Sequence, residues 1–103
     1  MSKRDKVRDY LTNDLGLNIL RTIDRLNPIE LPTSRLCTVK EVSEAANLPM
    51  KETWNLINQA YDAGLVTFYT GLLSRRKVDL TEIGEKLCEC ETAEDIKAVL
   101  YEL

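Results

Sequence analysis

The sequence predicts a mainly α-helical protein with one small β-hairpin. Apolar residues recur three or four positions apart over most of the chain, which is the spacing of an amphipathic helix. Between two such stretches, a β-branched and aromatic run at residues 65–69 is followed by an alternating polar and apolar run at residues 76–80. The length of 103 residues, of which 44% are hydrophobic and 30% charged, fits one domain over residues 1–103.

The N-terminal segment, residues 4–26, is predicted to be helical because its apolar residues keep helical spacing. Residues 12–14 (Thr-Asn-Asp) leave open whether this segment forms one helix or two. Asn27 and Pro28 end it, and residues 28–37, which contain two prolines, are expected to form a loop.

Residues 38–63 are predicted to form two helices joined by a tight turn. Thr38 and Glu41 have the spacing of a capping box, so the first helix starts here and runs to about residue 46. Residues 47–49 stop it, Pro49 suits the first turn of the next helix, and Gly64 suits the position after its end at about residue 63. On this second helix, the core should receive Met50, Thr53, Trp54, Ile57, Ala60 and Tyr61, with Leu56 and Ala63 at its edge. The outer face should carry Lys51, Glu52, Asn55, Asn58, Gln59 and Asp62.

The remaining elements are a hairpin and two C-terminal helices. Residues 65–69 and 76–80 form the strands, with a turn at residues 71–75. Thr81 is expected to cap a helix that runs to about residue 90, and Thr92 to cap the last one. Their inward residues should be Ile83 and Leu87 in the first helix, and Ile96, Val99 and Leu100 in the second.

This order of elements is that of a winged helix-turn-helix domain with extra N- and C-terminal helices. The stretch from Glu41 to Val66, which ends in Ala-Gly-Leu-Val, resembles the helix-turn-helix of prokaryotic regulators. Residues 74–87 are similar to the signature of MarR- and PadR-type repressors, in which a basic hairpin runs into L-T-x-x-G-x-x-L. The resemblance covers about residues 36–90 and implies a helix-turn-helix at about 38–63, a wing at about 65–80 and C-terminal helices at about 81–103.

The same resemblance implies a non-enzymatic, sequence-specific transcription regulator that binds double-stranded DNA. In such domains a recognition helix enters the major groove, and the wing contacts the backbone or the minor groove. Amide side chains can pair bidentately with adenine, and cations can contact guanine or neutralise phosphates. The residues expected to contact DNA are Lys51, Asn55, Asn58 and Gln59 on the helix, and Arg75, Arg76 and Lys77 at the hairpin turn.

The charge distribution is compatible with DNA although the net charge is −3. Residues 79–103 hold eight acidic and two basic side chains, whereas residues 1–78 hold twelve basic and nine acidic ones. A second basic cluster, Lys3, Arg4, Lys6 and Arg8, is read as a solvated helix start or as an arm that contacts phosphates. Exposed charges are screened beyond about 8–10 Å, so the local charge decides what a ligand meets.

Catalysis, cofactors and membranes are not expected. The chain has no histidine, which removes the commonest general base, and its four glycines stand apart instead of forming a phosphate-binding loop. No cofactor or metal is therefore predicted. The charged N-terminus and the absence of a long apolar run predict neither a signal peptide nor a membrane helix, and hence a cytoplasmic protein.

Two further questions stay open from the sequence. The terminal helices, residues 4–26 and 92–103, carry apolar stripes that predict either a homodimer interface or packing within the same chain. Alternative functions are a winged-helix protein-interaction adaptor, which would use Trp54 and the acidic C-terminal third, and a metal- or redox-responsive regulator. The second alternative would use Cys37, Cys88 and Cys90, which otherwise are buried apolar residues or form a disulfide.

Overall fold

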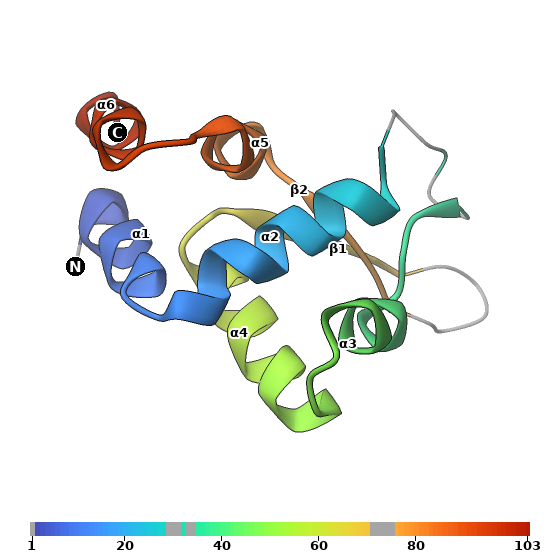
Figure 1. The fold of residues 1–103 in the computed structure, drawn as a ribbon. Coiled ribbons are helices and arrows are strands. Elements are labelled where there is room, and N and C mark those ends of the chain that lie inside the picture. The colour runs from blue at the N-terminus through green and yellow to red at the C-terminus, as the bar shows by residue number, and fades with distance from the viewer. Residues whose placement is uncertain (1, 29–31, 33–34, 71–75) are drawn as a thin grey trace.

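The computed structural model describes residues 2–28, 32, 35–70 and 76–103 (Figure 1). The predicted mainly α-helical fold with one hairpin is confirmed. The elements, in order, are α1 (Lys3–Leu11), α2 (Asp14–Leu26), α3 (Val39–Ala46), α4 (Met50–Asp62), β1 (Val66–Thr70), β2 (Arg76–Leu80), α5 (Glu82–Glu89) and α6 (Ala93–Tyr101). In the view of Figure 1, α2 crosses the middle of the molecule, α5 and α6 lie above it, and α3 and α4 lie below.

The N-terminal segment forms two helices rather than one. The Asn13 side chain accepts a hydrogen bond from the Leu15 backbone N–H at 2.9 Å and so caps the start of α2. The buried Tyr10 hydroxyl donates to the Gly16 carbonyl at 2.7 Å, which fixes α1 against the first turn of α2. A Cβ at position 16 would lie 2.8 Å from the Tyr10 carbonyl oxygen, so glycine allows this close approach.

The two strands pair in an antiparallel register that joins Val66 with Leu80 and Thr70 with Arg76. A bridge between Thr38 and Lys77 adds the residue before α3 to the outer edge of β2. The Val78 N–H donates to the Cys37 carbonyl at 2.9 Å, so the hairpin is hydrogen-bonded to the entrance of the helix-turn-helix. The sequence pattern did not predict this third segment, because residues 28–37 were expected to form only a loop.

The core is built around α2, with contributions from α3, α4, the hairpin base and α5. Its largest fully buried side chains are Ile19, Leu20, Ile23, Ile57, Leu65 and Leu87. The predicted inward face of α4 is partly wrong, because Met50 and Tyr61 are 42% and 54% exposed. The buried stripe is Thr53, Leu56, Ile57 and Ala60, which is rotated by about 60° from the predicted arc at 100° per residue.

The C-terminal helices start at the predicted caps. Thr81 and Thr92 each accept a hydrogen bond from the backbone N–H three residues later, and Asp95 completes a capping box in α6. Leu87 and Leu100 are buried, whereas the other predicted inward residues, Ile83, Ile96 and Val99, are half-buried. Within the described residues, no helix is both long and apolar enough to cross a membrane.

Candidate nucleic-acid interface

The turn between α3 and α4 sets the direction of the exposed helix. Asn47 adopts a left-handed backbone conformation, with φ 55° and ψ 47°, and its N–H donates to the last carbonyls of α3. The Ser43 hydroxyl donates to the Leu48 carbonyl at 2.6 Å and closes the turn. Pro49 is extended, with ψ 147°, and precedes α4 as its cap instead of lying in its first turn as predicted. These contacts fix α4 as the second helix of a helix-turn-helix.

The amide-bearing face of α4 points to solvent. The four residues predicted to contact DNA from this helix are exposed: Lys51, Asn55, Asn58 and Gln59. Asn55 follows Lys51 by four positions and precedes Asn58 and Gln59 by three and four, so these residues form one continuous stripe along the helix. Two carboxylates share this face, and one of them, Asp62, pairs with Lys6 of α1 at 3.6 Å.

Two of the three predicted wing cations, Arg76 and Lys77, lie in the described part of the hairpin. Arg75 is outside the described residues. Arg76 and Lys77 are the first residues of β2, and successive side chains of a strand point to opposite faces. Arg76 therefore shares the face of Val78 and Leu80, which are buried, and Lys77 shares the opposite face with its partner Tyr69. Arg76 and Lys77 thus place their charges on opposite sides of the hairpin.

Arg76 reaches α4 through aromatic contacts. Its guanidinium carbon lies 5.2 Å from the centre of the Phe68 ring and 5.7 Å from the centre of the Trp54 ring. The two rings are 6.2 Å apart, and Tyr61 stacks on the other side of this group, 5.1 Å from Phe68. Trp54 is half-buried, as expected of a residue at the edge of the core. The structure thus brings Arg76 next to the amide stripe, since Asn58 is one helical turn after Trp54.

A buried asparagine holds the wing against the rest of the fold. The Asn27 side-chain amide donates to the Val78 carbonyl at 3.0 Å and to the Asp79 carboxylate at 3.2 Å. Its carbonyl oxygen accepts from the Cys37 N–H at 2.9 Å. One side chain at the end of α2 therefore fixes both β2 and the strand-like residues before α3. In the sequence, Asn27 was visible only as a helix-ending residue.

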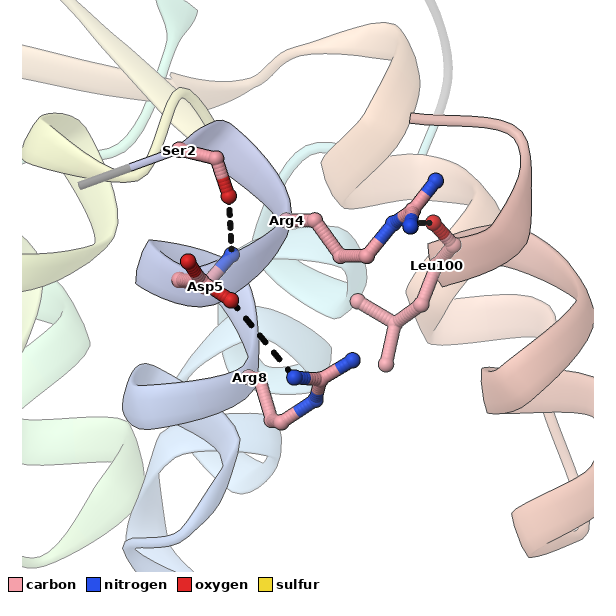
Figure 2. A network of polar contacts seen from close by, with 5 residues as sticks. All are labelled: Ser2, Arg4, Asp5, Arg8 and Leu100. Carbon is pink, nitrogen blue, oxygen red and sulfur yellow. Dashed lines mark hydrogen bonds and ion pairs between the residues drawn. The ribbon is translucent and has the colours of Figure 1, made fainter.

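Two arginines of the basic cluster of α1 contact other groups of the same chain. The Arg4 guanidinium donates to the Leu100 carbonyl at 2.9 Å and to the Tyr101 carbonyl at 3.2 Å, at the C-terminal end of α6 (Figure 2). Arg8 pairs with Asp5 at 3.5 Å in the same helix (Figure 2). The Arg4 contacts join the two ends of the chain, whereas the Arg8 pair lies within α1 and both arginines remain exposed.

The cysteines do not form a metal site. Within the described residues, no group of three or more cysteine, aspartate or glutamate side chains has the geometry to hold an ion, and all three thiols are free. Burial raises the pKa of the Cys37 thiol to about 11 and that of Cys88 to about 12. Burial therefore favours the neutral thiol, which is a poor nucleophile.

A cleft of about 240 Å³ between α1 and α4 is lined by Lys6, Asp9, Tyr10, Gln59 and Asp62. Ligand pockets are usually about 300–1,000 Å³ and mostly apolar, whereas this cleft is small and lined mainly by polar side chains.

Comparisons with known proteins identify the fold. No protein-family model and no curated protein matches the chain. A candidate DNA-binding protein from Ralstonia eutropha JMP134 superposes with a TM-score of 0.63 at 20% identity, covering 74% of this chain and 91% of its own. The MepR–DNA complex of Staphylococcus aureus superposes with a TM-score of 0.62 at 17% identity, covering 95% of this chain and 72% of MepR. A further MepR structure, described as a transcription regulator of the multidrug efflux pump MepA, gives a TM-score of 0.51 at 16% identity, over 91% of this chain and 76% of MepR.

The first of these neighbours is described as a candidate DNA-binding protein, and MepR is described as a transcription regulator. The chain therefore has a MarR-like winged-helix fold, as the resemblance of its sequence implied.

Proposed function

We propose that this protein is a sequence-specific, double-stranded DNA-binding transcription regulator without enzymatic activity, acting in the cytoplasm. The fold shared with a DNA-bound regulator supports the class. The observation that carries the proposal is the contact of Arg76 with Trp54, since it joins a wing cation to the exposed amide stripe of α4. A DNA duplex can meet both features at once only if they adjoin each other.

In this proposal, each group of residues contacts the part of the DNA that its chemistry can bind. Asn55, Asn58 and Gln59 present donors and acceptors for base edges in the major groove, as adenine recognition requires. Lys51, near the start of α4, contacts guanine or a phosphate. The wing residues Arg75, Arg76 and Lys77 neutralise the backbone or enter the minor groove beside it.

We also propose that the active form is a homodimer. α1 and α6 pack on each other within the chain, yet α6 keeps its outer side free, with Tyr101 83% exposed and the apolar Ile96 and Val99 only half-buried. A two-fold arrangement through these helices would place two recognition helices one DNA turn, about 34–36 Å, apart. The Cα radius of gyration of 13.1 Å supports one winged-helix domain per chain, since about 13 Å is typical of 100 residues.

Selection of bound duplexes from a random DNA pool, at 50 and 200 mM salt, tests this function. The expected result is enrichment of one motif with two related half-sites about 10 base pairs apart, with weaker retention at the higher salt. Light scattering at the same protein concentration checks the dimer independently. Failure to enrich any motif at either salt would refute sequence-specific DNA binding and would favour the adaptor alternative.

A further inference from the structure

The wing arginine is held in an unusual environment for an exposed cation. Arg76 is exposed, but its guanidinium lies over two aromatic rings, both within the distance of about 6 Å at which a cation is attracted to a ring face. One ring comes from β1 and the other from α4. The strand register explains the first contact, because Arg76 pairs with Thr70 and so lies diagonally opposite Phe68 on the same face of the hairpin.

This stacking fixes the side chain without consuming its hydrogen-bond donors. An aromatic ring offers no oxygen acceptor, so these contacts leave the five N–H donors of the guanidinium available to a phosphate. Among the described residues, no carboxylate pairs with Arg76. The aromatic contacts therefore order a long, flexible side chain before any ligand arrives, which lowers the entropy lost on binding.

The charge of the helix-turn-helix makes this cation important. Residues 38–63 contain two lysines and four carboxylates, so the recognition helix and its partner are not positively charged as a unit. Attraction to a DNA backbone must then come largely from the wing. Arg76 is the described wing cation on the same face of the hairpin as the contact with α4.

We propose that Trp54 and Phe68 are positioning residues that hold the Arg76 guanidinium for a backbone phosphate of duplex DNA, next to the recognition helix. This inference rests on the proposed DNA-binding function and deepens it. Trp54 and Phe68 act through Arg76 and do not themselves touch the DNA.

A double-mutant cycle tests the proposal with a duplex obtained from the selection. Trp54→Leu and Phe68→Leu should each weaken binding about two- to fivefold, the range expected for an exposed cation–aromatic contact. Either change should have no further effect when Arg76→Ala is already present. Arg76→Ala should also lower the slope of log K against log salt by about 0.9, whereas Trp54→Leu, which keeps the cation, should leave the slope unchanged.

Matched controls separate positioning from folding. Tyr61→Leu removes a ring that stacks on Phe68 rather than under the guanidinium, so it should leave DNA affinity unchanged. Trp54→Phe keeps an aromatic face and should restore most of the affinity lost in Trp54→Leu. Thermal melts identify any variant that fails to fold. If Trp54→Leu does not fold, Phe68→Leu tests the same positioning role.

The fluorescence of Trp54, the single tryptophan of the chain, reports the stacking without DNA. Arg76→Ala should shift its emission to longer wavelength and increase its quenching by acrylamide. Unchanged emission, or losses in affinity that add in the cycle while wild type binds DNA, would overturn the positioning role alone. If wild type binds no duplex at all, the proposed function fails and the phosphate assignment fails with it.

Discussion

Asn27→Ala should destabilise the protein more than its small change in volume suggests. The side chain is 8% exposed and forms three hydrogen bonds, two to β2 and one to the backbone before α3. Alanine removes all three and leaves the buried Cys37 N–H without its partner. The two bonds to β2 contribute about 1 kcal/mol each, and an orphaned buried N–H costs about 1–3 kcal/mol.

The expected loss is therefore about 3–5 kcal/mol of unfolding free energy, which is a large share of the 5–15 kcal/mol typical of a domain. For a chain of this size, that loss lowers the melting temperature by about 12 °C or more. Thermal and urea unfolding, followed by circular dichroism, measure both quantities. Asn18→Ala is a matched control, because Asn18 is exposed on α2 and loss of its side chain should leave the unfolding free energy unchanged.

A second variant separates hydrogen bonding from packing. Asn27→Leu refills the volume but leaves the same backbone N–H unpaired, so it should be about as unstable as Asn27→Ala. Recovery of wild-type stability in Asn27→Leu would show that packing, and not hydrogen bonding, explains the loss. A melting temperature of Asn27→Ala within 2–3 °C of Asn18→Ala would refute the assigned role altogether, since it corresponds to well under 1 kcal/mol.

Three further predictions follow from other contacts. Arg4→Ala should speed amide hydrogen exchange in α6 about fivefold, and not in α3, because it removes the donors to the last carbonyls of α6 at a cost of about 1 kcal/mol. Gly84→Ala should cost about 2 kcal/mol or more in thermal unfolding, since its Cβ would lie only 2.2 Å from the Leu65 carbonyl oxygen. Burial raises the pKa of Cys37 to about 11 and of Cys88 to about 12. The neutral thiols therefore contribute their full stability below the unfolded pKa of about 8.5, and this contribution falls as the pH rises from there toward the folded pKa values. In urea unfolding at pH 8 and 10.5, a variant with both thiols changed to alanine should therefore lose less stability than wild type.

Local sequence signals predicted most of the fold, because the residues that start and end a helix lie within it or next to it. The capping box at Thr38, the left-handed Asn47 and the glycine at position 64 with φ 77° each act within a few residues of the helix end that they define. The strand alternation was equally local, and it already placed Arg76 on the face of Val78 and Leu80. The expectation that Arg76 and Lys77 act together at the turn overlooked that alternation.

Local sequence patterns could not predict the contacts that position the site, because these contacts join distant parts of the chain. Asn27 bonds to residues 51 and 52 positions later, and Arg4 bonds to carbonyls 96 and 97 positions later. No periodic pattern encodes such a partner, since a polar residue at a helix end has many possible ones. The rotation of the α4 stripe has the same origin: the hairpin packs beside Trp54 and Tyr61, and the helix turns its smaller residues toward α2.

The distribution of charge explains how a chain of net charge −3 can still approach DNA. The acidic side chains of residues 79–103 lie mainly on α5 and α6, on the opposite side of α2 from α3 and α4 (Figure 1). The shortest extent of the molecule is 26 Å, whereas screening at physiological salt acts over about 8 Å, so DNA bound at α4 would meet little of that repulsion. At 0.01 M salt the screening length is about 30 Å and the repulsion spans the molecule. Lowering the salt should therefore strengthen binding less than the wing cations alone would require.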